Sequence, residues 1–322
     1  MTIIVTGAAG FIGRNVVATL NREGHADLVL VDQLGGQEKW KNLRGLDYED
    51  WISPGDLERW LHGRAGVEAV IHLGACSDTT ESDADFLLEN NYRYSRQLGS
   101  WAVEHEARFV YASSAATYGD GAHGYTDDDA NTRRLRPLNM YGYSKHMFDL
   151  WALRSGLLAQ VVGLKFFNVF GPYEEHKGDM RSVVAKAHGQ ILATGELSLF
   201  KSYRQDVADG EQRRDFVYVD DAVAVILHFL KRRDVSGLYN CGTGVARTWV
   251  ELAGAVFKAM DRPANLRFVD MPEGIRAKYQ YFTQADTSRL RRAGFEADFL
   301  DLDSAIDVYV RSHLNEVAEE TR

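Results

Sequence analysis

The fold is set by Ile3-Ile4-Val5-Thr6-Gly7-Ala8-Ala9-Gly10-Phe11-Ile12-Gly13, a stretch near the start of the chain. A β-branched run leads into spaced glycines, and apolar residues at helical spacing follow as far as Leu20. A strand, a glycine turn and a helix in this order are typical of a dinucleotide site, with the pyrophosphate at the helix N-terminus. Gly7 permits the tight turn, Gly10 the approach of a pyrophosphate, and Gly13 close packing of the helix on the strand. The G-x-x-G-x-x-G spacing departs from the commonest fingerprint, so its context carries the prediction.

Strand and helix patterns alternate along the rest of the first half. Buried strands are predicted at 28–31, 69–73, 108–111 and 160–165. We expect short helices and loops over 43–66, one long helix over 83–104, and an exposed loop over 120–136. This alternation predicts an α/β fold, a Rossmann doubly wound parallel sheet.

Pro172 indicates passage into a smaller mixed α/β region, with a helix over 182–194 and a strand over 197–200. We therefore expect residues 1–170, joined by 215–242, to form the cofactor-binding Rossmann domain. Residues 171–214 and 243–322 should form mainly the substrate-binding domain.

Composition narrows the class of protein. A hydrophobic content of 45% and a charged content of 26% are ordinary for a globular chain. The net charge of -9 argues against a nucleic-acid or anionic-membrane partner. No run approaches the roughly 20 apolar residues that a membrane helix needs. The chain enters a strand at once, and Cys76 and Cys241 fit no metal spacing. We expect a cytoplasmic protein with no signal peptide and no metal.

Polar and small residues follow the predicted strands, where a doubly wound sheet binds its ligand. Asp32 ends the second strand and can bind an adenosine ribose, which favours NAD. Lys39 follows and could pair with a 2′-phosphate, so the residues leave NAD and NADP open. The run Leu73-Gly74-Ala75-Cys76-Ser77 leaves the next strand. Ser114 follows the strand at 108–111 and either binds a substrate oxygen or caps a turn.

A tyrosine and a lysine share one helix face further on. Tyr141 and Lys145 stand at i, i+4 in Tyr141-Gly142-Tyr143-Ser144-Lys145. A phenol has a pKa of about 10, and a neighbouring ammonium favours the phenolate and lowers that pKa. The pair could be an acid/base group, or a tyrosine packed on a lysine stem.

Together with the glycine fingerprint and Ser114, this pair resembles the extended short-chain dehydrogenase/reductase family, whose members act on nucleotide sugars. The resemblance covers nearly the whole chain. Within the family, His176-Lys177-Gly178 and Phe282-Thr283-Gln284-Ala285-Asp286 most resemble the epimerases of ADP-heptose. Other matching motifs are Glu89-Asn90-Asn91-Tyr92, Phe167-Asn168-Val169-Phe170-Gly171-Pro172 and Arg214-Asp215-Phe216-Val217-Tyr218-Val219.

This resemblance implies a mechanism. Tyr141 would take the proton of a secondary alcohol while hydride leaves the same carbon, C6 of the heptose. Ser114 would hold the oxygen, and Lys145 would lower the pKa of the tyrosine and bind the nicotinamide ribose. The ketone would turn and receive hydride on its other face, with Lys177 as second acid/base group. The resemblance also implies NADP, a role in lipopolysaccharide inner-core synthesis, and a homo-oligomer, in the family a pentamer.

The resemblance assigns further residues to each ligand. The cofactor would be lined by Gly7, Gly10, Phe11, Ile12, Gly13, Asp32, Gln33, Lys39, Leu73, Gly74, Ala75, Cys76, Ser77, Asn90, Lys145, Val169 and Lys177. The ADP-sugar would be lined by Ser114, Asn168, Asp179, Lys186, Phe200, Lys201, Ser202, Tyr203, Arg214 and Tyr279. The sequence departs from the family at Pro54, in place of a cofactor lysine, at Lys186, in place of a histidine, and at Asp179, in place of a serine. Insertions lie near 121–133 and 203–212.

Three other functions share some of these motifs, and two of them conflict with other residues of the chain. A UDP-hexose 4-epimerase would share Ser114, Tyr141 and Lys145. A 4,6-dehydratase would carry an Asp-Glu pair where this chain has Ala115 and Ala116. A non-catalytic dinucleotide-binding regulator would keep the fingerprint but typically lose the tyrosine–lysine pair.

Overall fold

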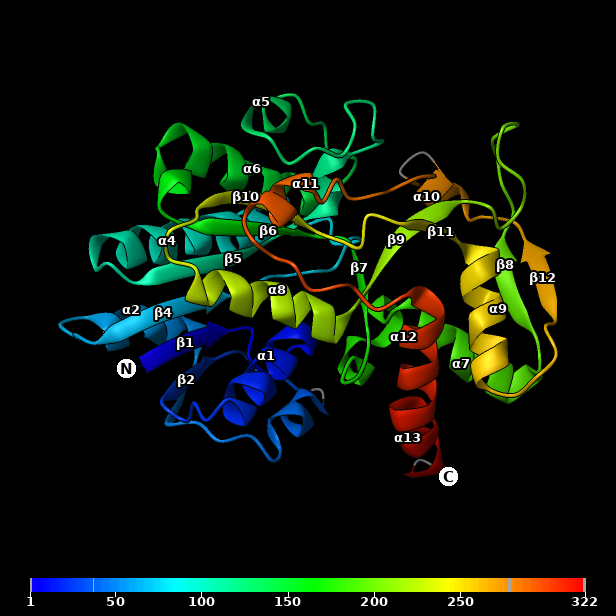
Figure 1. The fold of residues 1–322 in the computed structure, drawn as a ribbon, viewed down its shortest axis with the longest axis horizontal. Coiled ribbons are helices and arrows are strands. Elements are labelled where there is room, and N and C mark those ends of the chain that lie inside the picture. The colour runs from blue at the N-terminus through cyan, green and yellow to red at the C-terminus, as the bar shows by residue number, and fades with distance from the viewer. Residues whose placement is uncertain (1, 37, 277–278, 321–322) are drawn as a thin grey trace.

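A seven-stranded parallel sheet forms the centre of the protein. The computed structural model describes residues 2–36, 38–276 and 279–320. The strand order is β10-β6-β5-β4-β1-β2-β3, so the sheet grows outward on both sides of β1 and β4 (Figure 1). This is the doubly wound arrangement, and the predicted fold class is confirmed. The strands are β1 (Thr2–Thr6), β2 (Leu28–Val31), β3 (Asp50–Ile52), β4 (Val67–His72), β5 (Arg108–Ser114), β6 (Val162–Phe166) and β10 (Gly237–Cys241).

Both faces of this sheet are buried, because alternate residues of each strand enter different cores. On β1, Ile3 and Val5 pack with helices α1 (Phe11–Arg22) and α8 (Val219–Lys231). Ile4 joins the opposite core, which contains residues of α4 (Tyr94–Glu104) and α6 (Met140–Arg154). Continuous apolar runs such as 28–31 are therefore strands covered on both sides.

Two smaller sheets and their helices build the second region, at the right of Figure 1. Strand β9 (Arg213–Tyr218) lies between β7 (Asn168–Phe170) and β11 (Ala246–Thr248), and β8 (Leu197–Phe200) pairs with β12 (Leu266–Val269). A separate core contains residues of α7 (Val183–Thr194), α9 (Trp249–Ala259) and α12 (Leu302–Tyr309). The division into residues 1–170 with 215–242, and 171–214 with 243–322, stays a prediction.

Short helices complete the chain. They are α2 (Leu57–Leu61), α3 (Ala84–Leu87), α5 (Asp129–Thr132), α10 (Glu273–Arg276), α11 (Ser288–Arg292) and α13 (Asn315–Glu320), with 3-10 turns at Glu38–Leu43, Pro54–Asp56, Ala115–Tyr118, Leu157–Ala159 and Glu175–Met180.

Two local expectations were wrong, and a third was confirmed with an added detail. The segment 43–66 contains a strand, β3, in which only Ile52 is buried, so no alternating apolar pattern marks it in the sequence. The helix expected over 83–104 runs from Ala84 to Glu104 and includes a π-helical turn at Leu88–Arg93. The loop expected over 120–136 contains α5, whose N-cap Asp128 accepts a hydrogen bond from the Asn131 amide at 2.7 Å.

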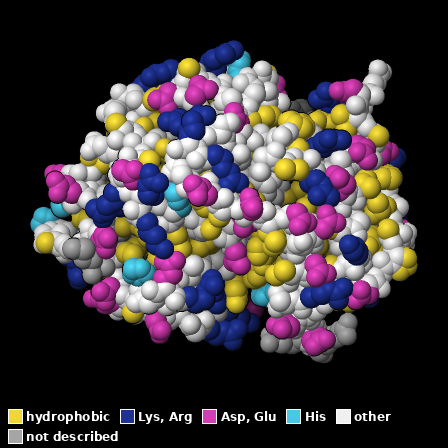
Figure 2. All heavy atoms as spheres, viewed as in Figure 1, with side chains coloured by type: hydrophobic (Ala, Val, Ile, Leu, Met, Phe, Trp, Pro, Cys, Tyr) yellow, Lys and Arg dark blue, Asp and Glu magenta, His cyan; other side chains and the backbone are white. Residues whose placement is uncertain are grey.

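Charged side chains of both signs are interspersed over the face drawn in Figure 2. Within the described ranges, no helix combines the length and the apolar character needed to cross a bilayer.

Candidate active site

The glycine turn after β1 packs so tightly that its glycines cannot be replaced by larger residues. Gly7 has φ +69°, and a Cβ there would lie 2.7 Å from the Gly74 nitrogen. A Cβ on Gly13 would lie 2.0 Å from the Gly7 carbonyl oxygen. Gly13 therefore lets α1 approach the turn itself, rather than the strand as the sequence suggested. The N-cap Gly10 offers no side-chain cap, and the first turn of α1 has no acidic residue. Its amides are thus available to an anion such as a pyrophosphate.

Asp32 and Lys39 meet beside this turn. The Asp32 carboxylate accepts hydrogen bonds from the Ala9 amide at 2.9 Å and the Gln33 amide at 2.7 Å. The Lys39 ammonium lies 2.5 Å from the same carboxylate. The two residues that pointed to different cofactors therefore occupy one position, at the carboxyl end of β2.

The exit of β4 is held against the catalytic helix by an asparagine. The Cys76 amide donates to the Asn91 side chain, and that side chain donates back to the Cys76 carbonyl, both at 2.9 Å. Asn91 also donates to Ser144 of α6 at 3.0 Å. It is fully buried within the π-helical turn, which turns the neighbouring Asn90 toward partial exposure. In the sequence Asn91 stands out only as part of the motif Glu89-Asn90-Asn91-Tyr92, and no local pattern signals this positioning role.

Ser114, Tyr141 and Lys145 come together at the carboxyl end of β5 and the start of α6. The helix is capped by Asn139, whose side chain accepts from the Gly142 amide at 2.7 Å. A Cβ on Gly142 would lie 2.8 Å from the Ala116 carbonyl, so this glycine lets Tyr141 approach Ser114. Gly142 was also missed, although it stands inside the quoted motif.

The electrostatics of this group differ from the expectation. Burial raises the pKa of Tyr141, and the Ser114 hydroxyl opposes that rise without cancelling it. Burial lowers the pKa of Lys145 to about 8, against the opposing effect of Asp149. The Lys145 ammonium donates to the Ala112 carbonyl at 2.9 Å. Since that lysine points at the backbone, it does not depress the pKa of Tyr141 in this arrangement.

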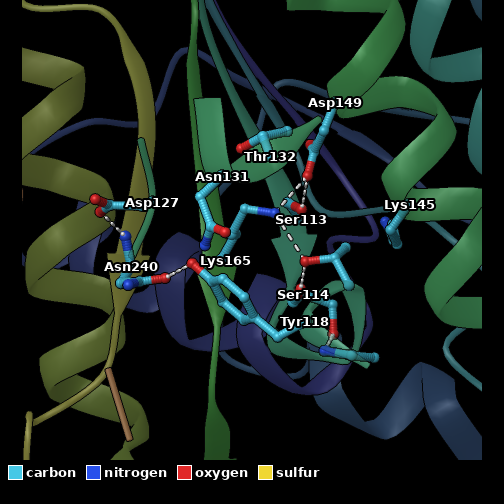
Figure 3. A network of polar contacts seen from close by, with 12 residues as sticks. Ser113, Ser114, Tyr118, Asp127, Asn131, Thr132, Lys145, Asp149, Lys165 and Asn240 are labelled. Carbon is cyan, nitrogen blue, oxygen red and sulfur yellow. Dashed lines mark hydrogen bonds and ion pairs between the residues drawn. The ribbon is translucent and has the colours of Figure 1, made fainter. Parts of the chain in front are cut away.

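A sealed ionic network lies behind the group (Figure 3). Lys165 on β6 and Asp149 on α6 are fully buried and 2.9 Å apart. Asp149 also accepts from Ser113 at 2.7 Å and from Tyr111 at 2.9 Å. Through these contacts one carboxylate ties β5, β6 and α6 together directly beneath Ser114. Sequence alone offers no signal for this, since Asp149 reads as one more polar residue on a helix.

Lys177 lies in a separate element, the 3-10 turn at Glu175–Met180. Its ammonium is 5.1 Å from the centre of the Phe11 ring at the start of α1. Asn42 holds the segment in place by donating to the Ala9 carbonyl at 2.9 Å while its amide lies 3.1 Å from His176. Lys177 is therefore beside the phosphate turn, and its described contacts do not include Tyr141 or Ser114.

Two of the predicted sugar-nucleotide residues, Arg214 and Tyr279, meet in the second region. The buried Arg214 guanidinium lies 5.1 Å from the Tyr279 ring centre and 5.7 Å from that of Trp249. Trp249 donates to the Tyr279 hydroxyl at 2.9 Å. Among the described residues no carboxylate lies within ion-pair distance of Arg214, and burial lowers its pKa. A buried cation with aromatic walls suits an anionic ligand. Trp249 was not predicted, because a lone tryptophan on a helix reads as core.

The other predicted substrate residues are spread over three elements. Lys201 and Tyr203 both bind Asp270, at 3.2 and 3.1 Å. Lys186 donates to the Asp179 carbonyl at 3.3 Å at the start of α7. Phe200 and Ser202 flank Lys201 at the end of β8. Asn168 begins β7 and is followed by Val169, which was predicted to line the cofactor.

Comparison with known proteins agrees with this geometry. Residues 3–242 match the NAD dependent epimerase/dehydratase family. The chain is 54% identical over 314 residues to the ADP-L-glycero-D-manno-heptose-6-epimerase of Nitratidesulfovibrio vulgaris, with 97% of each chain covered. The Fusobacterium nucleatum protein of that name is 45% identical over 325 residues, 97% of this chain and 98% of that one. A crystal structure of the Helicobacter pylori enzyme has a TM-score of 0.81 at 28% identity, covering 97% and 95%.

The resemblance inferred from the motifs is thus confirmed. The free amides of α1 and the close glycine turn fit a nicotinamide dinucleotide, the cofactor class of the matched family. The chain belongs to the NAD dependent epimerase/dehydratase family, among the ADP-L-glycero-D-manno-heptose-6-epimerases, and is an isomerase.

Proposed function

We propose that the protein interconverts ADP-D-glycero-D-manno-heptose and ADP-L-glycero-D-manno-heptose by transient oxidation at C6. The names of relatives at 45% and 54% identity support the substrate. The observation that carries the mechanism is that two candidate acid/base groups come from separate elements. Tyr141 comes from α6, and Lys177 comes from the segment beside Phe11. An oxidised and rotated sugar presents its oxygen in two different places, so epimerisation needs both.

The residues have distinct tasks in this mechanism. Tyr141 takes the hydroxyl proton of one epimer, and Ser114 donates a hydrogen bond to the oxygen as it becomes a carbonyl. A bound nicotinamide dinucleotide supplies reversible removal of hydride from C6. Lys177 then gives a proton to the oxygen of the turned ketone, so the product alcohol is inverted without net redox change. In the reverse direction the two groups exchange roles.

Lys145 would hold the nicotinamide ribose, and its buried position supports this role. Burial already lowers its pKa to about 8, so its proton is held less tightly than in a free lysine. Its helical position brings it one turn below Tyr141, where it would bind the nicotinamide ribose and favour the phenolate. For that purpose the ammonium must exchange its contact with the Ala112 carbonyl for the cofactor.

The ADP-sugar would lie between the two regions, with its diphosphate at Arg214. A planar guanidinium can bind phosphate oxygens in pairs. Tyr279 flanks the same position, as described above. Asn168, Asp179 and Lys186 would line the sugar side, and the run Phe200-Lys201-Ser202-Tyr203 would line the nucleotide.

For the cofactor we propose NADP, with NAD as a possible substitute. What supports this choice is the Lys39 ammonium beside the Asp32 carboxylate, where it could also pair with a 2′-phosphate. In titrations of the purified protein, Lys39→Ala should weaken NADP binding more than NAD binding. An equal loss for both cofactors would contradict this assignment.

We place the reaction in the cytoplasm, where its product would serve as the heptose donor for the lipopolysaccharide inner core. We also propose a homo-oligomer, a pentamer as in the family. Light scattering of the purified protein would measure its mass, and a monomer would contradict this proposal.

The direct test is incubation of the purified protein with ADP-D-glycero-D-manno-heptose, with inversion at C6 followed by NMR. Conversion to an equilibrium mixture of the two epimers is expected. UDP-galactose is the matched comparison, because turnover of that substrate alone would identify a UDP-hexose 4-epimerase. Tight cofactor binding without turnover of either sugar would identify a non-catalytic dinucleotide-binding regulator.

A further inference from the structure

A fully buried carboxylate stands behind the proposed catalytic lysine. The Glu174 side chain has no exposed surface, and one of its oxygens accepts from both the Ser182 hydroxyl at 2.5 Å and the Tyr309 hydroxyl at 3.0 Å. Its other oxygen accepts from the Ser182 amide at 2.5 Å and lies 3.8 Å from the Lys177 ammonium. A buried carboxylate with this many donors is held in one place.

The charges around Lys177 single out Glu174 as its counter-ion. On its own segment the neighbours are Glu174 and His176, and α7 contributes the like charge of Lys186. From α1 the uncharged ring of Phe11 faces it at 5.1 Å. Glu174 is therefore the one carboxylate with which Lys177 forms an ion pair among the described residues.

We infer that Glu174 is a positioning residue for the epimerisation, which fixes the Lys177 amine beside the phosphate turn and keeps it in its ammonium form. This inference rests on the proposed role of Lys177 as second acid/base group. Through Ser182 and Tyr309 the same carboxylate binds the start of α7 and the end of α12. Two helices therefore fix the carboxylate that pairs with the Lys177 amine.

The consequence is a pH dependence. Burial lowers the pKa of Lys177 and Lys186 lowers it further, while Glu174 raises it. In the direction in which Lys177 gives up its proton, the rate needs the ammonium and falls at alkaline pH. Removing the Glu174 charge lowers the pKa of Lys177, so this alkaline limit moves to lower pH. An opposite charge at this distance shifts a pKa by about 1 unit or more.

The test measures kcat against pH in both reaction directions for Glu174→Gln. We expect the alkaline limit of one direction to fall by about 1 pH unit or more. Glu175→Gln is the matched control, since that neighbouring carboxylate binds His313 at 2.7 Å instead of Lys177. Its profile should match the wild type. An unchanged profile in Glu174→Gln, or an equal shift in Glu175→Gln, would overturn the inference.

Two further variants separate positioning from folding. Ser182→Ala removes a hydrogen bond to Glu174 but keeps its charge, so it should lower stability without moving the alkaline limit. If Glu174→Gln does not fold, Glu174→Asp retains the charge at a longer distance and should move the limit by a fraction of a unit. A limit that moves as far in Ser182→Ala, where the Glu174 charge remains, as in Glu174→Gln counts against Glu174. An unmoved limit in Glu174→Asp counts against it as well.

Lys177→Met distinguishes this inference from the proposed function. Full activity in that variant would remove Lys177 from the mechanism and take the role of Glu174 with it. Loss of activity in Lys177→Met together with a wild-type profile in Glu174→Gln would reject the inference about Glu174 alone.

Discussion

The two proposed acid/base groups are held by different means. Tyr141 stands in a helix of 15 residues whose backbone bonds, N-cap and buried Asp149–Lys165 pair fix it from behind. Lys177 stands in a 3-10 turn of six residues, interrupted at Gly178 with φ +53°. Regular helical backbone bonds place the tyrosine. The lysine amide donates to the Glu174 carbonyl at 3.0 Å, and its segment is held by the side chains of Glu174 and Asn42. The candidate site thus combines a position set by a long helix with a position that depends mostly on tertiary contacts.

The largest expected effect tests whether both groups are essential. Tyr141→Phe keeps the ring and removes the acid/base oxygen, so kcat should fall by about 10²–10⁴-fold. Lys177→Met keeps the apolar stem and should cause a loss of the same order. Conversion of ADP-heptose followed by NMR measures both. Cofactor titration is the control for Tyr141→Phe, because that change leaves the phosphate turn and its neighbours unaltered.

Unequal losses would sharpen the comparison. If Lys177→Met retains full activity while Tyr141→Phe is inactive, a single acid/base group serves both epimers. If Tyr141→Phe retains full activity, the catalytic assignment of the helix is wrong.

The sequence predicted the part of the site around Tyr141 on α6 better than the part around Lys177 in the 3-10 turn. A glycine fingerprint, strand ends and an i, i+4 pair are local patterns, so the sheet, the turn at Gly7 and the group at Tyr141 could be placed without coordinates. Lys177 could be named only by resemblance, because nothing local distinguishes a catalytic lysine from a solvated one.

The residues that the sequence did not reveal act through long-range contacts. Asp149 bonds to β5 and β6, Asn91 to the exit of β4, and Glu174 to α7 and α12. Their partners are distant in the chain, and polar residues on helices are usually solvated. Burial raises the pKa of Tyr141 in this arrangement, and burial cannot be read from the spacing of Tyr141 and Lys145.

The next largest effect concerns the buried pair that supports the part of the site around Tyr141 on α6. Lys165→Met leaves the Asp149 carboxylate buried without its cation, which should lower the free energy of unfolding by about 3–5 kcal/mol. Urea denaturation of the folded protein measures the change. The double variant Lys165→Met with Asp149→Leu should recover part of the loss, because no unpaired charge then remains. A loss below about 1 kcal/mol in the single variant would mean that this pair contributes little more than an exposed one.

A smaller effect is expected at Arg214, on the substrate side. Arg214→Gln removes the buried cation, so KM for the ADP-sugar should rise by about 10–100-fold if charge-assisted hydrogen bonds of about 1.5–3 kcal/mol are lost. Since the diphosphate is remote from C6, kcat should change much less. Steady-state kinetics give both values. A fall in kcat with unchanged KM would place Arg214 near the reacting carbon instead.

The smallest effect is a dependence of the free energy of unfolding on pH. It arises from His72, which ends β4. Its ring is buried between the Thr6 hydroxyl at 2.7 Å and the Ser95 hydroxyl at 2.9 Å. Burial, with a contribution from Lys145, lowers the pKa of His72 to about 3. The neutral ring therefore favours the folded state at full strength above the ordinary pKa of about 6.5. As the pH falls from there toward 3, His72 binds a proton in the unfolded chain but stays neutral in the folded chain.

The free energy of unfolding should consequently decline by up to about 1.4 kcal/mol per pH unit through this window on account of His72. His72→Gln should be less stable near neutral pH but should lose this part of the slope. His25→Gln changes an exposed ring and is the control, so its slope should match the wild type. Denaturation at several pH values between 4 and 7 provides the slopes. If His72→Gln keeps the full slope, the acid sensitivity resides in other groups, and the ring between Thr6 and Ser95 acts only through its hydrogen bonds.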